Sequence, residues 1–212
     1  MGLAVEYVTF PQRRDRSLYV ARRFKPRLQG AVLDVGCFEA PLRQLIAPVP
    51  YTGIDMAGDP DITANLDSLE ALPFADGSFP CVICIEVLEH LENLHHMFAE
   101  LARVSSRHLI VSLPNCWGDA RVPIQRGRGH FRHYGLPLEK PLDRHRWFFS
   151  LGEARAFIEA KAVEFGLEIE ELFITEKPRN PLVRLARKLR YPGERYHNRY
   201  AQTLWAVLRK PG

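Results

Sequence analysis

The sequence predicts an α/β fold in which helices cover both faces of a largely parallel, doubly wound sheet. Short apolar runs alternate with helical patterns along most of the chain, which is typical of strands joined by helical crossovers. Residues 80–86 and 108–113 are apolar almost throughout, as expected for strands with both faces buried. No strong core helix separates the last two expected strands, 168–175 and 202–209, so we expect an edge pair whose final strand is antiparallel.

The other elements follow in chain order. Residues 1–29 are basic and aromatic, and we expect them to form a helical cover segment ahead of a domain spanning residues 30–212. Further apolar runs predict strands at 31–36, 51–55 and 61–66, which makes seven strands in all. Helical patterns cover residues 41–47, 92–104 and 150–165, the last of which begins with a capping box formed by Ser150 and Glu153.

Composition limits the class of protein. The 212 residues are enough to bury a core without disulfide bonds. The formal net charge is only +4, but basic residues gather in 121–146 and 179–199, which favours an anionic ligand or surface. Because the sequence has neither a signal-peptide pattern, nor a spanning apolar run, nor a disulfide framework, we expect a cytoplasmic protein.

Cys81 and Cys84 have the C-x-x-C spacing of metal and redox motifs. They lie in an expected strand, where side chains three residues apart point to opposite faces and cannot share one ion. We therefore interpret them as small buried apolar residues. The adjacent His95 and His96 are interpreted as solvated helix residues. No metal site is expected.

Two acids near strand ends form the strongest candidate site. Asp34 precedes Gly36, which occupies the turn into a helix and would let the backbone approach a ligand closely. Asp55 ends the next strand roughly 20 residues later, where an acid typically holds ribose hydroxyls. Each feature alone is well explained by ordinary turn residues. Together, in register, they favour an adenosine-containing cofactor.

Four segments extend this pattern along the chain: Leu33–Cys37, Leu72–Phe79, Val87–Leu91 and Val111–Asn115. In this order they resemble the class I S-adenosylmethionine-dependent methyltransferases of the type 11 kind, and the resemblance runs from about residue 31 to residue 209. It implies a Rossmann-like sheet and S-adenosylmethionine as the cofactor.

The resemblance also implies roles for individual residues. Asp34 and Gly36 would line the methionine end of the cofactor, Asp55 would hold its ribose, and Glu86 would lie under it. The residues expected beside the adenine are Asn65 and Leu66. For Glu86, capping of the following helix is an equally good interpretation.

The cofactor loop departs from the family pattern. Phe38 stands where the family usually has a second glycine, and Ala40 where it often has a third. We expect Phe38 to resist the left-handed backbone conformation and to crowd the cofactor. Asn65 stands where relatives often carry an aspartate. These differences keep open a fold that binds the cofactor without catalysis and serves as an interaction module.

Residues 117–149 follow the expected strand at 108–113 and form the expected substrate-side insertion. Arginines and histidines alternate there with aromatic residues, a mixture suited to recognising an anionic group. The alternative is a solvated basic loop pinned to the core by Trp147 and Phe149. His145 and His133 are the candidate catalytic residues, either as a general base for a hydroxyl acceptor or as ligands of an acceptor anion.

We therefore expect a methyltransferase for a small-molecule or glycan-like, anionic acceptor. An RNA methyltransferase stays open because the loops are basic, but the absence of an appended RNA-binding motif argues against a nucleic acid partner. Residues 181–190 predict a basic amphipathic helix, which either packs on the domain edge or makes peripheral contact with an anionic membrane. The sequence does not predict the oligomeric state.

Overall fold

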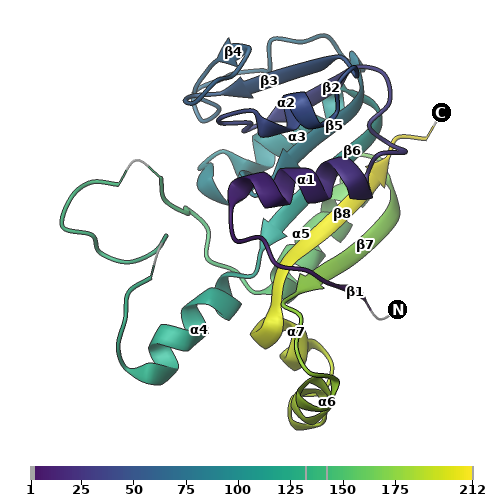
Figure 1. The fold of residues 1–212 in the computed structure, drawn as a ribbon. Coiled ribbons are helices and arrows are strands. Elements are labelled where there is room, and N and C mark those ends of the chain that lie inside the picture. The colour runs from purple at the N-terminus through teal and green to yellow at the C-terminus, as the bar shows by residue number, and fades with distance from the viewer. Residues whose placement is uncertain (1–2, 132, 142, 212) are drawn as a thin grey trace.

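Eight strands form one sheet in the computed structural model of the chain, which describes residues 3–131, 133–141 and 143–211 (Figure 1). Their order across the sheet is β1-β7-β8-β6-β5-β2-β3-β4. All pairs are parallel except those of β8, which runs antiparallel to β6 and β7 as predicted. The strands are β1 (Ala4–Tyr7), β2 (Val32–Val35), β3 (Tyr51–Asp55), β4 (Ile62–Thr63), β5 (Phe79–Ile85), β6 (Ser105–Pro114), β7 (Glu168–Glu176) and β8 (Ala201–Arg209).

The eighth strand, β1, comes from the N-terminal segment that we expected to be wholly helical. It pairs with β7 at the sheet edge, with Val5 opposite Ile174, and the helix α1 (Arg13–Arg23) begins only after it. Glu6 of β1 accepts hydrogen bonds from Tyr19 Oη at 2.6 Å and Arg23 Nε at 2.8 Å. The segment is therefore held to the sheet edge by β1 and then folds back across the sheet as α1.

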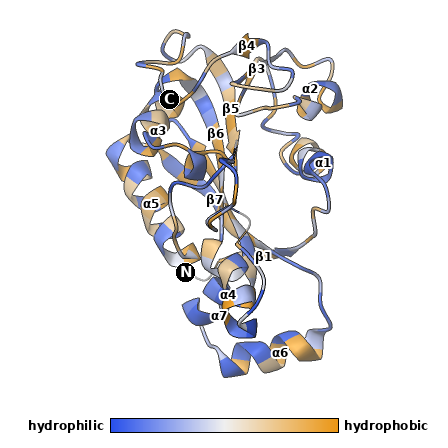
Figure 2. Cartoon of the chain, turned by 90° about the vertical axis from the view of Figure 1, so that its left-hand side faces the viewer, coloured by the Kyte–Doolittle hydropathy of each residue, from blue (hydrophilic) through white to orange (hydrophobic). Residues whose placement is uncertain are grey.

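Two helical layers enclose the sheet, as Figure 2 shows with α1 and α2 on one side and α3 and α5 on the other. Apolar residues of α1 and α2 pack with Trp205 and Val207 of β8 in one core, whereas α3 and α5 contribute to the larger core on the opposite face. The helices are α2 (Pro41–Leu45), α3 (Leu94–Val104), α4 (Cys116–Arg126), α5 (Leu151–Glu164), α6 (Pro181–Arg190) and α7 (Glu194–Tyr200), with a 3-10 turn η1 (Leu88–His90).

The predicted capping box of α5 is present. Ser150 Oγ accepts a hydrogen bond from the Glu153 amide at 3.1 Å, and Glu153 Oε2 accepts one from the Ser150 amide at 2.7 Å. Helices α4 and α7 have no counterpart in the sequence-based prediction. The expected strand at 61–66 is reduced to two residues in β4.

One edge of the sheet collects the elements that form the site. The parallel strands β2, β3, β5 and β6 end there, and the antiparallel β8 begins there, directly after α7. Helix α4 follows β6 at this edge and leads into an irregular segment that runs away from the sheet and back to α5 (Figure 1). Within the described ranges, no helix combines the length and the apolar character needed to cross a membrane.

Candidate functional site

The loop between β2 and α2 follows a glycine-like course even where glycine is absent. Gly36 has φ +82°, and a Cβ there would lie 2.2 Å from Val87 Cγ2, so only glycine fits without displacing Val87. Phe38 and Ala40 also have positive φ, 49° and 47°. Phe38 therefore adopts the left-handed conformation despite the steric cost of its side chain. Asp55 Oδ2 accepts a hydrogen bond from the Phe38 amide at 2.8 Å, and the Arg13 guanidinium lies over the Phe38 ring at 4.7 Å.

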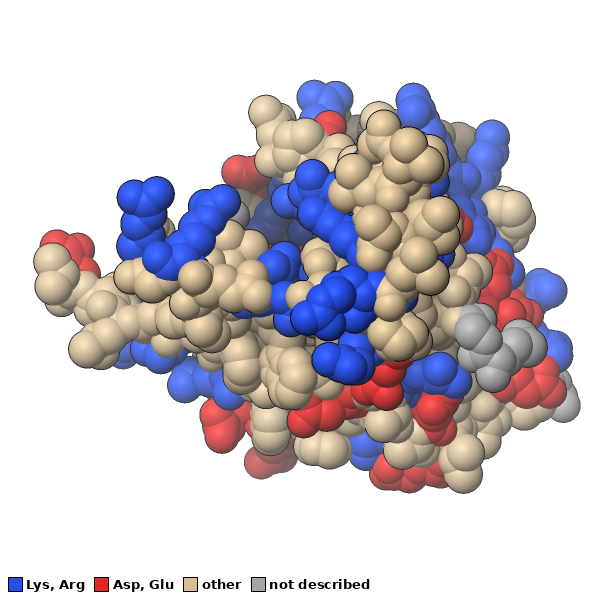
Figure 3. All heavy atoms as spheres, turned by 90° about the horizontal axis from the view of Figure 1, so that it is seen from below, with Lys and Arg blue, Asp and Glu red and all other residues tan. Residues whose placement is uncertain are grey.

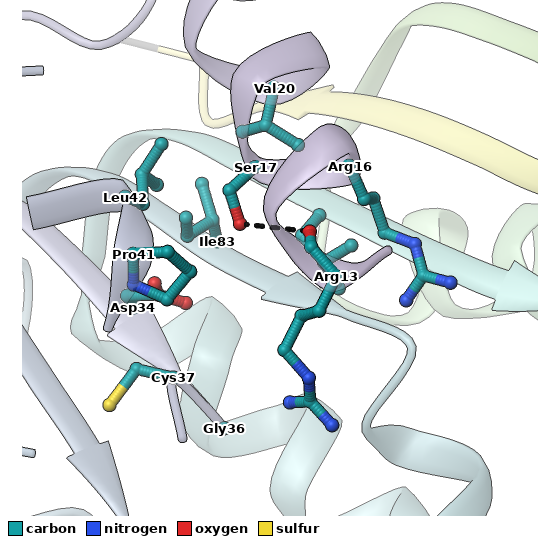
Figure 4. Close-up of a pocket in the computed structure, with 11 residues that line it drawn as sticks. Arg13, Arg16, Ser17, Val20, Asp34, Gly36, Cys37, Pro41, Leu42 and Ile83 are labelled. Atoms are coloured by element: carbon teal, nitrogen blue, oxygen red, sulfur yellow. Dashed lines mark hydrogen bonds between the residues drawn. The ribbon is translucent and has the colours of Figure 1, made fainter. Parts of the chain in front are cut away.

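Asp34 is a buried carboxylate at the end of β2. Its Oδ2 accepts a hydrogen bond from Tyr51 Oη at 2.8 Å. Burial raises the pKa of Asp34 to about 7, with a further contribution from the Asp55 charge, against the opposing effects of the Tyr51 hydrogen bond and the Arg13 charge. Asp34 and Gly36 line a small pocket closed by Ser17 and Val20 of α1 (Figure 4). The arrangement would be stabilised by a ligand cation beside Asp34.

The other predicted cofactor residues lie at the ends of the neighbouring strands. The carboxylate of Asp55 also accepts a hydrogen bond from the Ala57 amide at 3.1 Å. It therefore holds the loop that follows β3 as well as the loop that follows β2. Asn65 is exposed, and its Oδ1 accepts a hydrogen bond from the Asp67 amide. The neighbouring Leu66 is buried. Since β4 pairs with β3, these residues follow the strand next to Asp55.

Glu86 connects the end of β5 to α1. It has positive φ directly after β5, and its carboxylate is held by Thr203 Oγ1 at 2.7 Å and Arg16 Nη2 at 2.6 Å. Its side chain therefore ties β8 and α1 together rather than capping a helix. Sequence reasoning missed Arg13 and Arg16, because arginines in a basic helix are typical of a solvated face.

A larger cleft of about 820 Å³ adjoins this edge and shares Arg13, Arg16 and Ile85 with the small pocket. Ligand pockets typically have volumes of roughly 300–1,000 Å³, whereas the pocket beside Asp34 measures only about 50 Å³. The cleft is walled by α1, α4, α6, α7, the end of β5 and the segment that contains the predicted residues His133 and His145. Both predicted histidines therefore face the cleft.

Three arginines, Arg121, Arg187 and Arg199, form what we term the arginine cluster of this cleft. Burial and the nearby Arg199 and Arg187 charges lower the pKa of Arg121. Arg121 and Arg187 lie over the Tyr200 ring at 5.2 and 4.4 Å. In the part of the chain that the structure describes, none of the three forms a salt bridge with a carboxylate. Figure 3 shows Lys and Arg side chains around the hollow on this face.

A second group, which we term the histidine cluster, consists of Glu89, His90, His133 and His145. The His145 ring stacks on His133, with centroids 4.4 Å apart, and meets the His90 ring edge-on at 4.4 Å. Asp143 Oδ1 lies 2.6 Å from His90 Nδ1. Burial and the neighbouring histidines lower the pKa of His145 to about 3. A neutral imidazole of such low basicity is a weak general base near pH 7.

Backbone hydrogen bonds hold the cluster in place. The carbonyl of Glu89 accepts from the amides of Arg146 at 2.8 Å and Trp147 at 3.4 Å. Trp147 Nε1 donates to the Leu91 carbonyl at 2.7 Å. Residues 145–147 are therefore fixed along η1, which brings His145 against His90. The Glu-His pair at Glu89 and His90, directly after an apolar strand, is the sequence signal for this cluster.

The fold is that of the class I S-adenosylmethionine-dependent methyltransferases, with acids at the ends of β2 and β3 and a cleft beside them. Residues 33–108 match the family model described as a methyltransferase domain, and this stretch contains Asp34, Gly36 and Asp55. The match agrees with the resemblance that the sequence shows over these residues. No curated protein matches the sequence.

Solved structures agree on the fold. An S-adenosylmethionine-dependent methyltransferase from Mesorhizobium loti has a TM-score of 0.57 and 18% identity over 93% of this chain and 100% of that chain. Magnesium protoporphyrin IX methyltransferase from Synechocystis PCC 6803, with bound SAH, has a TM-score of 0.55 and 19% identity over 95% of this chain and 89% of that chain. The small RNA methyltransferase HEN1 has a TM-score of 0.63 and 15% identity. The match covers 98% of this chain but only 26% of the HEN1 chain. At these identities the likeness establishes the fold alone.

Proposed function

We propose that this protein transfers a methyl group from S-adenosylmethionine to a small-molecule or glycan-like acceptor that carries a negative charge. The observation that carries the acceptor class is the arginine cluster, whose three guanidinium groups line one cleft without a carboxylate partner among the described residues. Such a group binds phosphate or carboxylate strongly, because charge-assisted hydrogen bonds to guanidinium are short and often bidentate.

In this proposal the cofactor lies across the ends of β2, β3 and β5. Asp34 and the backbone at Gly36 hold its methionine end, Asp55 its ribose, and Glu86 lies beneath it. The adenine lies beside Asn65 and Leu66. Two observations support this assignment. Asp34 is buried without a salt bridge among the described residues, so an ammonium group of the cofactor would stabilise its charge. The glycine-like course of the loop lets the cofactor approach the backbone closely.

The cofactor supplies a methyl group that is already activated, so the protein's task is to position the acceptor and exclude water. Arg13 and Arg16 cover the small pocket beside Asp34, which at about 50 Å³ is too small for a nucleoside. Binding therefore requires these two side chains to move. The arginine cluster then holds the acceptor anion, and the histidine cluster lines the cleft next to Glu86.

The first test is binding of S-adenosylhomocysteine by calorimetry. Asp55→Ala removes charge-assisted hydrogen bonds worth about 1.5–3 kcal/mol, so we expect roughly 10- to 150-fold weaker binding. Asp76→Ala is the matched control, because Asp76 is exposed and lies just before β5 begins, at the opposite sheet edge. Absence of binding to the unmodified protein would favour the interaction-module alternative.

The acceptor class is tested by methyl transfer to a panel of phosphorylated and carboxylated sugars. We expect Arg121→Gln and Arg187→Gln to raise KM at least about tenfold, since each removes a charged hydrogen-bond donor. Arg155→Gln on α5, whose side chain pairs with Glu159, should leave KM unchanged. Methylation of RNA with a steep dependence on log salt would replace the small-molecule acceptor with a nucleic acid.

We also propose that α6 docks the protein on an anionic lipid surface beside the cleft. Leu182 and Leu189 are each 75% exposed, and none of the α6 residues is buried. On the other face, Arg184, Arg187 and Lys188 lie over the rings of Tyr7, Tyr200 and Tyr196, and the helix contains no acid. A short helix with an apolar face and a basic face lies in the interface of an anionic membrane. In Figure 3 this helix borders the basic hollow.

Sedimentation with phosphatidylcholine vesicles, with and without phosphatidylglycerol, tests the docking. We expect binding only to the anionic vesicles, and its loss in the double variant Leu182→Glu/Leu189→Glu. Val163→Glu is the control, because Val163 is equally exposed but lies on α5. Equal binding to neutral vesicles, or unchanged binding of the double variant, would contradict the assignment.

A further inference from the structure

The histidine cluster contains a set of donor atoms that suits a metal ion. One carboxylate oxygen of Glu89 and one ring nitrogen each of His90 and His145 all lie within 4.8 Å of one another. Two imidazoles and one carboxylate are a common ligand set for divalent transition-metal ions, with the remaining positions open to water or substrate. All three residues line the larger cleft.

Glu89 supplies a second, independent observation. Its side chain is 1% exposed, and its Oε2 has no hydrogen-bond partner among the described residues. The other oxygen, Oε1, lies 3.7 Å from His90 Nε2. A buried carboxyl oxygen without a partner is costly, since most buried polar atoms in folded proteins are hydrogen-bonded. A cation between Glu89 and the two histidines would remove this cost.

Each histidine has an oxygen close to its Nδ1. Asp143 Oδ1 lies 2.6 Å from His90 Nδ1 as an ion-pair contact without hydrogen-bond geometry, and His90 Nε2 lies 3.7 Å from Glu89 Oε1. Tyr134 Oη lies 2.6 Å from His145 Nδ1 and donates its proton to the Trp147 carbonyl at 3.2 Å. When the hydroxyl donates to this carbonyl it accepts from His145 Nδ1, and in that tautomer Nε2 of His145 keeps its lone pair. Metal-bound histidines are typically held in this way by outer carboxylate and oxygen partners.

We propose that Glu89, His90 and His145 bind one divalent transition-metal ion, and that Asp143 and Tyr134 are positioning residues for the two histidines. Glu86 is not a ligand in this proposal, because Arg16 and Thr203 occupy its carboxylate. The sequence predicts no metal site, because only the fold brings His145 beside Glu89 and His90.

The metal ion also gives a role to the cleft wall, and this part rests on the proposed function. A hydroxyl of the acceptor would complete the coordination, which lowers the pKa of the hydroxyl. Its proton leaves to solvent, the oxygen lone pair forms the bond to the methyl carbon, and the electrons of the broken carbon–sulfur bond stay on sulfur. Metal binding itself does not depend on this step.

The test is a titration of untagged, chelator-treated protein with Co²⁺, followed by visible absorption and calorimetry. We expect one ion per chain with a Kd well below about 1 mM. Glu89→Gln and His145→Ala should each weaken binding more than about 100-fold, and Asp143→Asn about 10-fold, as for an outer partner. His96→Ala on α3 is the control and should bind as the unmodified protein does.

Melting curves establish whether each variant is folded. If one of the two ligand variants does not fold, the other still tests the site. A bound ion should also raise the melting temperature of the unmodified protein and not that of Glu89→Gln. Absence of one-to-one binding, or equal binding by Glu89→Gln and His145→Ala, would overturn the metal site. S-adenosylhomocysteine binding is measured separately, so failure of the metal site and failure of the proposed function are distinguishable.

Discussion

The three residues proposed to bind the cofactor, Asp34, Gly36 and Asp55, form what we term the cofactor edge. This edge and the histidine cluster lie at the same end of the sheet but are built differently. Each residue of the cofactor edge is placed by the end of its own strand, and β2 and β3 are neighbours in the sheet. The histidine cluster instead depends on Trp147 and the carbonyl of Glu89, which join η1 to a segment more than fifty residues later in the chain. Local backbone geometry therefore governs one site, and tertiary contacts govern the other.

The largest expected effect tests the dependence of the cofactor edge on local backbone. Gly36→Ala forces a Cβ against Val87 at a positive φ, so we expect the free energy of unfolding to fall by about 2–5 kcal/mol from backbone strain and overpacking. Cofactor affinity should fall with it. Gly127→Ala is the matched control, because Gly127 also has positive φ but has nothing within 4 Å of the added atom.

Urea denaturation of the two variants measures the difference. Gly127→Ala should lose only the strain contribution, about 1–2 kcal/mol. Equal losses in the two variants would mean that the close approach of Val87 to the loop contributes nothing, and the cofactor edge would then not depend on this glycine for space.

The next prediction concerns the charge of Asp34. Burial raises its pKa to about 7 from 3.8, so between these values the folded state binds more protons than the unfolded state. The stability contributed by protonated Asp34 is present at low pH and is lost as the pH rises toward 7. Asp34→Asn escapes this loss and keeps an acceptor for Tyr51. We expect its stability relative to the unmodified protein to increase by roughly 2–3 kcal/mol between pH 5 and pH 8.

Denaturation at the two pH values checks this, and calorimetry at pH 8 checks its functional counterpart. Asp34→Asn should bind S-adenosylhomocysteine more weakly, because the neutral amide no longer attracts an ammonium group. If the variant gains stability at pH 8 and loses affinity, Asp34 contributes to binding at the expense of stability. If the stability difference does not change with pH, Asp34 is ionised in the folded protein and has a cation partner.

The same comparison explains how much of the fold the sequence predicts. Strands β5 and β6 and helices α3 and α5 were predicted because their apolar patterns are long and their ends are marked, as at Ser150. Strand β1 was missed because four half-exposed residues carry no clear period. Helix α4 contains Pro123, and α7 lacks an apolar pattern, so neither could be recognised from local sequence.

For the candidate site, sequence reasoning proposed Asp34 and Asp55, whose neighbours in space are set by strand order. It named His133 and His145 individually, and both line the cleft. It could not bring them together with His90, because the hydrogen bonds from Arg146 and Trp147 to Glu89 are tertiary contacts without a sequence pattern. The arginine cluster was equally hidden, since Arg121 lies on α4 while Arg187 and Arg199 lie on α6 and α7.

The smallest expected effect concerns Phe38, where local strain and tertiary packing oppose each other. Phe38→Gly relieves a left-handed backbone that costs about 1–2 kcal/mol for a residue with a side chain. It also removes the contact of the ring with Arg13, worth about 0.5–1 kcal/mol, and makes the unfolded chain more flexible at a similar cost. We therefore expect stability to change by no more than about 1 kcal/mol.

Cofactor affinity separates the two contributions. The affinity of Phe38→Gly for S-adenosylhomocysteine should equal that of the unmodified protein or exceed it by up to about tenfold. The reason is that the ring is gone from the loop and Arg13 is free to move. Phe38→Ala keeps the strained backbone and lacks the ring, so its affinity shows which of the two matters. If both variants bind more than about tenfold more weakly while remaining folded, the ring itself contacts the cofactor. Phe38 would then be a residue of the cofactor edge that is placed by packing against α1, and the contrast between a locally built site and a tertiary one would no longer hold at this position.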